Sequence, residues 1–310
     1  MHPFTHNEIY GNWATLLLSW NSDETLDYAR TTSDLTTLIA MQVSGIYING
    51  TAGEFYSLTE HEFDQIALLL TEHCEVANVP FQIGASHMSA QISLERLKRS
   101  VALAPATFQI ILPDWYPLTD EEAIDFLYRM ADAAEGIGLV LYNPPHAKRV
   151  LSPETIGLLA REVPSLVGVK VAGGNDAWYA SLRQHLSKIS VFVSGHHLAS
   201  GFSQGAQGSY SNVACLHPRA AQHWWECMST DLPKALEMEQ RIQCFMNEHI
   251  IPFITNEKFS NAAVDRFLAQ IGDWGNLSEG MRWPYRSIPR AEANRLRPIA
   301  QQVLPEFFET

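Results

Sequence analysis

A lysine at the end of an apolar strand is the residue around which the chemistry of this chain can be organised. Apolar residues without polar alternation fill most of Val163-Pro-Ser-Leu-Val-Gly-Val-Lys170, as in a parallel strand buried on both faces. Burial lowers the pKa of an amine, so Lys170 would be partly neutral near pH 7 and could attack a ketone to form a Schiff base. The alternative is a strand-end lysine that reaches solvent or discourages strand pairing.

A glycine-framed turn follows the second predicted strand. Its sequence is Asn49-Gly-Thr-Ala-Gly-Glu-Phe55. Glycine permits tight backbone geometry, successive amides can hold an anion, and the Thr51 hydroxyl adds a donor. We therefore expect Gly50, Thr51 and Ala52 to bind a carboxylate, although such turns are often purely structural.

A tyrosine stands at the end of the fifth predicted strand, one strand away from Lys170. It belongs to Leu141-Tyr142-Asn143-Pro144-Pro145-His146. Near an iminium ion the pKa of a phenol falls, and Tyr142 could then act as general acid and base. The alternative is an amphipathic aromatic that caps the barrel with its hydroxyl in water.

Two adjacent histidines, His196 and His197, follow the seventh predicted strand. A metal-dependent barrel hydrolase is one reading of them. Adjacent side chains on an extended segment point to opposite sides, and no HxH or HExxH companion is present. We instead expect them to shape the pocket around the distal end of a substrate.

Strand-like and helix-like segments alternate along most of the chain, which predicts a (β/α)8 TIM barrel, an α/β fold. A doubly wound open sheet is the alternative, but no GxGxxG follows the first strand. Barrel chemistry lies at the carboxyl ends of the strands, where Lys170 falls. The predicted strands are Trp13 to Leu18, Gly45 to Asn49, Phe81 to Gly84, Phe108 to Leu112, Gly138 to Tyr142, Leu166 to Lys170, Val191 to Ser194 and Gly208 to Ser211.

Helix start signals follow several of the predicted strands and so set the order of strand and helix in each unit. Near residue 231 the alternation of strands and helices ends. Thr59 with Glu62 and Thr119 with Glu122 fit capping boxes, and Ser152-Pro153 fits an N-cap followed by proline. Strand signals stop at about residue 232, so we predict a barrel over 1–231 and a helical extension over 232–310. The extension is expected to contain helices at Leu232 to Ile254, Asn256 to Ile271 and Arg290 to Val303.

Composition narrows the class of protein. The 310 residues carry a net charge of −13, which argues against nucleic-acid or anionic-membrane partners. The four cysteines show no metal-ligand spacing. The amino-terminal residues have no signal-peptide pattern, and no apolar run approaches the ~18 residues that span a bilayer. We expect a cytoplasmic protein.

Taken together, the motifs resemble those of the dihydrodipicolinate synthase / N-acetylneuraminate lyase family. Their order and spacing match over almost the whole chain, including a first strand around Thr15 to Trp20. The matching motifs are Gly50-Thr-Ala-Gly-Glu54, Tyr142-Asn-Pro-Pro145, Gly168-Val-Lys-Val-Ala-Gly-Gly174, Ser194-Gly195, Gly205-Ala-Gln-Gly208 and Gly280-Met-Arg-Trp-Pro284.

The resemblance implies a class I lyase that acts on 2-oxo acids, with pyruvate as product or donor and with neither metal nor cofactor. It implies that Lys170 forms the imine, that Tyr142 relays protons, and that Thr51 and the Ala52 amide hold the substrate carboxylate. It also implies a homo-dimer or homo-tetramer, often with a second tyrosine borrowed from the partner subunit.

Three positions depart from the family pattern. Ala52 replaces a threonine, so a proton chain through that hydroxyl is broken. Trp115 stands where the borrowed tyrosine is expected, and Tyr116 is one residue out of register. Ala147 replaces an arginine with which the lysine-biosynthesis synthase recognises its substrate, which speaks against that activity.

For the substrate we expect a 2-oxo-3-deoxy sugar acid, because donors and acceptors cluster near the seventh and eighth strands and hydrogen-bonding pockets discriminate strongly. Cleavage and dehydration stay open, and the alternative from another class is a non-catalytic binder of 2-oxo acids. An aromatic adduct of pyruvate would need an apolar cleft. The expected donors are His196, His197, Ser209, Tyr210, Ser211 and Asn212.

Overall fold

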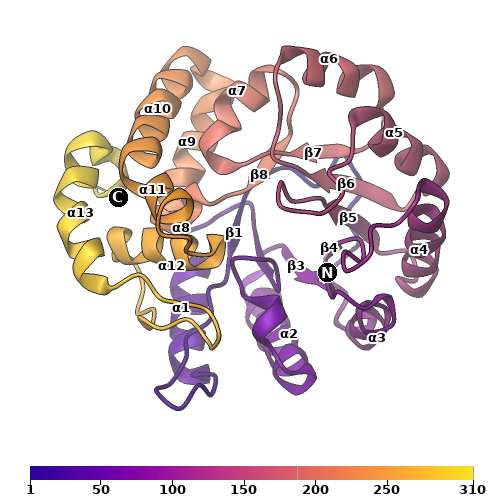
Figure 1. Cartoon of the computed structure of the whole chain (residues 1–310), viewed down its shortest axis with the longest axis horizontal. Coiled ribbons are helices and arrows are strands. Elements are labelled where there is room, and N and C mark those ends of the chain that lie inside the picture. The colour runs from indigo at the N-terminus through magenta and orange to yellow at the C-terminus, as the bar shows by residue number, and fades with distance from the viewer. Residues whose placement is uncertain (187, 310) are drawn as a thin grey trace.

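The computed structural model describes residues 1–186 and 188–309, and its centre is a closed barrel of eight parallel strands paired in sequence order (Figure 1). The predicted (β/α)8 barrel is therefore confirmed. Each strand is short and buried, as expected for strands covered by helices on one side and packed inside on the other. The strands are β1 Gly11–Thr15, β2 Gly45–Ile48, β3 Phe81–Gly84, β4 Thr107–Ile110, β5 Gly138–Tyr142, β6 Leu166–Lys170, β7 Ser190–Phe192 and β8 Gly208–Tyr210.

Helices connect the strands and continue past the last one. The ring consists of α1 Tyr28–Ala40, α2 Glu60–Ala77, α3 Ala90–Ser100, α4 Asp120–Ala133, α5 Pro153–Glu162, α6 Asp176–His185, α7 Leu198–Ser203, the short α8 Val213–Leu216 and α9 Pro218–Thr230. The remaining helices are α10 Leu232–Phe245, α11 Ile251–Thr255, α12 Asn261–Gly272 and α13 Arg290–Val303. The division at residue 231 into barrel and extension stays a prediction.

Alternate residues of each strand fill the barrel, with aromatic rings at its centre. Trp13, Tyr47, Phe192 and Tyr210 form one buried cluster. The Tyr210 ring lies 4.7 Å from Phe192 and 5.0 Å from Tyr47, between ring centroids. These rings form a solid floor, so the polar side chains one layer higher face an open mouth at the carboxyl end of the strands.

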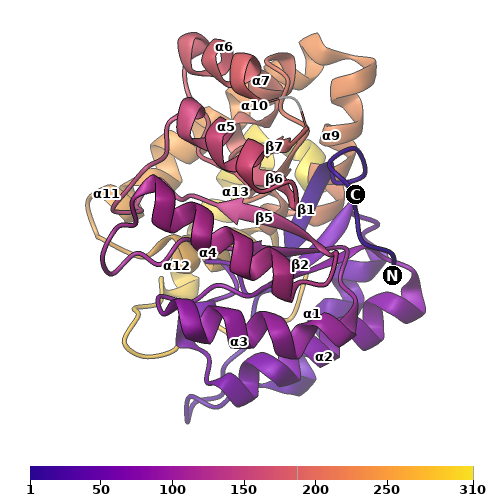
Figure 2. The same ribbon diagram turned by 90° about the vertical axis from the view of Figure 1, so that its right-hand side faces the viewer.

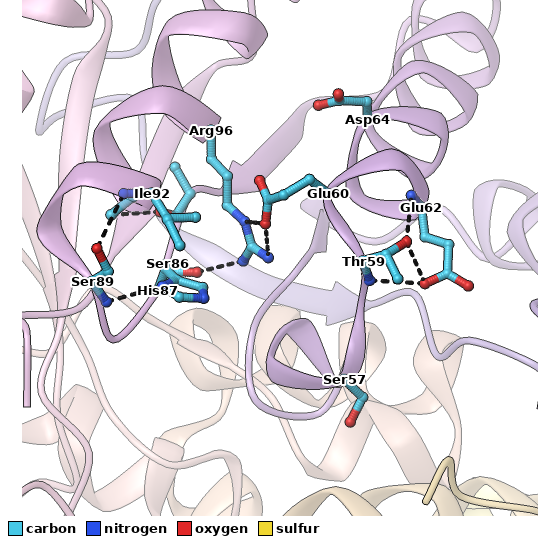
Figure 3. Close-up of polar contacts among 12 residues, drawn as sticks. Ser57, Thr59, Glu60, Glu62, Asp64, Ser86, His87, Ser89, Ile92 and Arg96 are labelled. Carbon is cyan, nitrogen blue, oxygen red and sulfur yellow. Dashed lines mark hydrogen bonds and ion pairs between the residues drawn. The ribbon is translucent and has the colours of Figure 1, made fainter. Parts of the chain in front are cut away.

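The predicted helix starts at Thr59, Thr119 and Ser152 are confirmed, and Figure 3 shows the first of them. Thr59 and Glu62 form a complete capping box at the start of α2. In the same view Arg96 of α3, which is almost fully buried, binds Glu60 at 2.7 Å and the Ser86 carbonyl at 2.7 Å. These contacts fix α2 and α3 against the loop that follows β3.

The largest differences from the predicted boundaries fall in the first strand and in the helices after residue 231, and β2, β4, β7 and β8 differ by one or two residues at an end. The first strand is Gly11–Thr15 rather than Trp13 to Leu18, because the chain leaves the sheet after Thr15 while Leu16, Leu17 and Leu18 remain buried in loop structure. Apolar residues alone cannot reveal where strand pairing ends.

The predicted helix from Leu232 to Ile254 is interrupted by a π-helical turn, Met246–Ile250, before α11. Pro252 lacks an amide hydrogen, which accounts for a change in hydrogen bonding just before it. Residues 256–260 are not helical, and Lys258 has a φ of 61°. The helix predicted from Asn256 instead begins at Asn261 with Ser260 as N-cap, whereas α13 matches its predicted range.

The two ends of the barrel are closed by different parts of the chain. In Figure 2 the amino terminus lies on one side of the barrel and α11 and α12 lie on the other. Met1 and Phe4 pack against the internal aromatic cluster, while residues of α12 line the mouth where β5 and β6 end. None of the helices in the described ranges is long and apolar enough to cross a membrane.

Candidate active site

Lys170, the last residue of β6, points into the mouth of the barrel. Its Nζ atom lies 4.0 Å from the ring centroid of Tyr142, 5.2 Å from that of Tyr47 and 5.3 Å from that of Tyr210. Within the described residues, Nζ has no hydrogen-bond or ion-pair partner. Burial lowers the Lys170 pKa to about 8, and the opposing effect of Asp265 is smaller. The amine is thus surrounded by aromatic faces, and it loses its proton more easily than an exposed lysine.

Tyr142 is brought beside Lys170 by strand pairing, because the two residues are register partners at the ends of β5 and β6. Burial raises the Tyr142 pKa to about 12, and a hydrogen bond with Thr51 opposes that rise. The phenol therefore stays protonated across the physiological range. It can donate a proton, or accept one transiently while a neighbouring group takes its own.

The turn after β2 carries Thr51 and Ala52 to the same cavity. Their two amides have no hydrogen-bond partner within the described ranges, so they are available to an anion. The glycines were expected to supply the unusual backbone geometry of the turn. The residues in the left-handed region are instead Asn49, with a φ of 57°, and Glu54, with a φ of 53°.

Close packing explains the glycine at position 50. A Cβ atom there would lie 2.7 Å from the Tyr47 ring, so only glycine allows the turn to sit this low over the barrel. Gly50 itself is not among the residues that line the cavity, and its contact with substrate stays a prediction.

A cavity of 360 Å³ surrounds these groups at the mouth of the barrel. A second, larger cleft of 660 Å³ adjoins it, and the two share Thr51, Tyr142, Pro145 and Asn261. The smaller cavity has mixed lining, whereas apolar side chains dominate the cleft. The apolar members of the cleft include Phe55, Met88, Ile111, Leu112, Leu118 and Phe259.

Five of the six residues expected to bind the far end of the substrate line the smaller cavity, and these are His196, His197, Tyr210, Ser211 and Asn212. Ser209 does not line it and is fully buried. The Tyr210 ring forms part of its floor, and the Tyr210 hydroxyl accepts a hydrogen bond from Gln82 at 2.8 Å. Asn212 contacts His196, with 3.0 Å between Nδ2 and Nδ1. His197 is exposed, and its Nδ1 lies 2.9 Å from Nε2 of Gln243 on α10.

The two histidines do not point to opposite sides as expected. They lie on a 3₁₀ turn, Gly195–His197, and their ring centroids are 4.4 Å apart. A tight turn replaces the extended backbone on which that expectation rested. Among the residues that the structure describes, no group of three or more histidine, cysteine, aspartate or glutamate side chains could hold a metal ion.

The loop after β4 leaves two aromatic rings in the open. Trp115 is 81% exposed and Tyr116 is 84% exposed. Lys148 fixes the backbone of this loop through a 2.6 Å bond from Nζ to the Trp115 carbonyl. Ala147 lines the cleft, as does Arg149, but Arg149 is already bonded to the Leu118 carbonyl at 2.6 Å and paired with Asp120.

One acidic group of the cavity was missed from the sequence. Asp265 of α12 is the only carboxylate among the described residues that line it. Burial raises the Asp265 pKa to about 7, and the positive charge of Lys170 opposes that rise. The signal was an acid inside Asn261-Ala-Ala-Val-Asp-Arg-Phe-Leu-Ala269, where most neighbours are apolar.

The chain is similar to known proteins over nearly its whole length. Residues 9–301 match the model of the Dihydrodipicolinate synthetase family. A 4-hydroxy-tetrahydrodipicolinate synthase of Exiguobacterium is 32% identical over 183 residues, which is 57% of this chain and 61% of that protein. A probable 5-dehydro-4-deoxyglucarate dehydratase of Bradyrhizobium diazoefficiens is 26% identical over 59% of this chain and 57% of its own. These two matches thus span less than two thirds of either relative.

Solved structures share the fold over nearly the full length. A prophage protein of the dihydrodipicolinic acid synthase family from E. coli, in complex with pyruvate, superposes with a TM-score of 0.82 at 20% identity, covering 95% of this chain and 98% of that one. A sialic acid aldolase of Ruminococcus gnavus superposes with a TM-score of 0.81 at 16% identity, covering 96% and 98%.

Proposed function

The chain belongs to the dihydrodipicolinate synthetase family, and from this premise we propose that it is a class I lyase that joins Lys170 to a 2-oxo acid through a Schiff base. The observation that carries the proposal is the state of Lys170. Its amine is buried against the Tyr142 ring at 4.0 Å, and burial lowers its pKa to about 8. A neutral amine in a water-poor pocket is what imine formation requires.

The reaction begins with binding of the 2-oxo acid. Its carboxylate accepts hydrogen bonds from the Thr51 hydroxyl and from the free amides of Thr51 and Ala52, which turns the ketone toward Lys170. Nζ attacks the ketone carbon, and the carbonyl oxygen leaves as water after receiving one proton from the attacking amine and one from Tyr142. The product is a protonated imine that can draw electrons from the neighbouring carbon.

The substrate that we propose is a 2-oxo-3-deoxy sugar acid. The polar side of the lysine cavity supports this choice, because Ser194, Ser211 and Asn212 line it together with the two histidines. Several hydroxyl groups on one chain would find partners there. Cleavage to pyruvate and an aldehyde, and dehydration, are both compatible with the same imine.

The adjoining cleft supports a second candidate. Its 660 Å³ and mainly apolar lining would suit an aryl aldehyde released from, or added to, the pyruvyl imine. An apolar group placed there would be removed from water against side chains such as Phe55, Leu112 and Phe259. The two candidates therefore differ in which cavity holds the aldehyde part.

The proposal includes neither metal nor cofactor, and it places the protein in the cytoplasm as a homo-dimer or homo-tetramer. A panel of five- and six-carbon 2-oxo-3-deoxy acids and of aryl adducts of pyruvate, assayed for pyruvate release and for loss of water, tests it. Turnover of a sugar acid supports the first candidate, and turnover of aryl adducts alone supports the second. Tight binding of pyruvate without any turnover would favour a non-catalytic binding protein instead.

A further inference from the structure

We propose that Asp265 is a second acid–base residue of this site. It exchanges a proton with the substrate hydroxyl two carbons beyond the imine carbon, the group that becomes the aldehyde oxygen in cleavage and leaves as water in dehydration. The inference rests on the proposed function of Lys170. It concerns a residue of α12, outside the strands and the strand-end loops that supply Lys170, Tyr142 and Thr51. The carboxyl group lines the same 360 Å³ cavity as those three residues.

The position of Asp265 is fixed by the residue that follows it. Arg266 is almost fully buried and donates hydrogen bonds to Glu54 Oε1 at 2.5 Å and to the Leu18 carbonyl at 2.6 Å. Glu54 ends the turn that carries Thr51 and Ala52, and it also accepts a bond from Trp20 at 3.2 Å. A buried ion pair thus clamps α12 to the turn that is proposed to hold the substrate carboxylate.

The Asp265 carboxyl group itself has no hydrogen-bond or ion-pair partner in the described parts of the chain. A half-buried, unpartnered carboxyl that faces a cavity is costly for folding. Structural carboxylates of this protein are treated differently, since Glu54 and Glu60 each bind buried arginines. The contrast indicates that the free lone pairs of Asp265 serve a ligand.

Electrostatics suit the group for proton transfer near neutral pH. Burial raises the Asp265 pKa to about 7 and lowers that of Lys170 to about 8, while each charge moderates the other shift. The other titratable groups on the cavity wall are Tyr47, Tyr142, His196, His197, Tyr210 and Cys215. Burial holds the Tyr142 pKa near 12, so near neutral pH Tyr142 needs a partner to pass on its proton, and Ala52 has no hydroxyl to do so.

Each proton that moves has a donor and an acceptor, both in cleavage and in dehydration. In cleavage, the Asp265 carboxylate takes the proton from the hydroxyl two carbons beyond the imine carbon. The carbon–carbon bond then breaks, its electron pair moves to the imine nitrogen, and an aldehyde leaves. In dehydration, Tyr142, which has given up its proton during imine formation, takes a proton from the carbon beside the imine carbon. Protonated Asp265 gives its proton to the hydroxyl on the next carbon, which leaves as water.

The test compares Asp265→Asn with wild type in two assays. The first traps pyruvate on Lys170 with borohydride, and the second follows condensation of pyruvate with glyceraldehyde and with benzaldehyde. We expect the trapped adduct in both proteins and a loss of turnover on the order of 100-fold or more in Asp265→Asn. We also expect the variant to lose the pH dependence of kcat near pH 7, and Asp265→Glu to recover part of the activity.

A matched control is Asp273→Asn, which removes a carboxylate at the other end of α12, where it binds Arg290 at 3.0 Å. This control should keep wild-type turnover, and all variants should show the circular dichroism of wild type. Turnover of Asp265→Asn within threefold of wild type, with the adduct retained, would overturn the inference and leave the proposed function intact. No adduct in the wild type would instead remove the proposed function, and an adduct without condensation of either aldehyde would also overturn the inference.

Discussion

At the scale of single residues, burial separates the proton affinities of two groups that would titrate almost together in water. The ordinary values are 10.5 for Lys170 and 10.0 for Tyr142, and burial moves their pKa values to about 8 and about 12. Between those limits the amine and the phenol are both neutral. A neutral nucleophile beside a neutral acid is the combination that attack on a ketone needs.

This separation predicts a pH dependence for the first chemical step. The rate at which pyruvate is trapped on Lys170 should rise with pH through about 8 and then level, because only the neutral amine attacks. Initial rates of trapping with cyanoborohydride between pH 6 and pH 10 measure it. A rate that continues to rise toward the ordinary lysine pKa of 10.5 would show that the amine is solvated.

Tyr142→Phe keeps the ring that packs on Lys170 and removes only the hydroxyl. We predict a fall in kcat of about 10²- to 10⁴-fold, the usual contribution of general acid–base catalysis, while the protein still folds and binds pyruvate. Steady-state kinetics and near-ultraviolet circular dichroism check both parts. Unchanged kcat would remove Tyr142 from the mechanism.

Most of the residues placed at this site could be predicted from the sequence, since strand ends and turn motifs are local patterns. Lys170, Tyr142, Thr51 and Ala52 do line one cavity, although their chemical roles stay proposals. Asp265 was missed. Its apolar neighbours indicate a buried acid, but its place at the barrel mouth depends on helix packing, which brings it there from a distant part of the chain. The packing of Gly50 against Tyr47 could not be predicted from the sequence either, because it depends on how closely the turn approaches the barrel interior.

At the scale of elements, the Glu54–Arg266 pair is the contact that joins α12 to the loop after β2. Both side chains are buried, at 0% and 2% exposure. Arg266→Ala leaves a buried carboxylate without its partner, so we expect a loss of about 3 to 5 kcal/mol in the free energy of unfolding. Urea denaturation measures this change.

A surface ion pair provides the control for that measurement. Arg30 and Asp27 lie 3.5 Å apart on the exposed start of α1, and Arg30→Ala should cost no more than about 1 kcal/mol. Equal losses of unfolding free energy in the two variants would mean that water or Trp20 satisfies the Glu54 carboxylate. In that case apolar packing alone would hold α12 in place.

The start of α2 is a second junction with the carboxyl-terminal segment. Arg282 donates to Glu62 at 2.6 Å and to the Ser57 carbonyl at 2.9 Å. Figure 3 labels both partners, of which Glu62 belongs to the capping box and Ser57 precedes it. The capping box and this start of α2 were predictable from adjacent residues. The interruption of α10 at Met246 was not predicted, although Pro252, which lacks an amide hydrogen, is a local signal for it.

At the scale of the whole molecule, the exposed aromatic residues suggest a partner surface. Trp115, Tyr116 and Trp283 are 74% to 84% exposed, and isolated monomers rarely leave such large rings in water. We predict a homo-oligomer, with the loop after β4 in an interface. Light scattering at micromolar concentration should give at least twice the mass of the chain.

A substitution in that loop tests the location of the interface. Trp115→Ser should shift the protein toward smaller species, whereas Tyr128→Ser on the outer face of α4, where the ring is 49% exposed, should not. A wild-type protein that scatters as a monomer would exclude a site shared between subunits. An oligomer unaffected by Trp115→Ser would place the interface elsewhere.

Borohydride trapping followed by peptide mass analysis tests the central claim most directly. The wild-type protein is incubated with pyruvate, reduced and digested, with Lys170→Ala and Lys148→Ala treated in parallel. The account predicts a stable pyruvyl adduct on the peptide that contains Lys170, its loss in Lys170→Ala, and its persistence in Lys148→Ala. An absent adduct, or one that remains in Lys170→Ala, would contradict it.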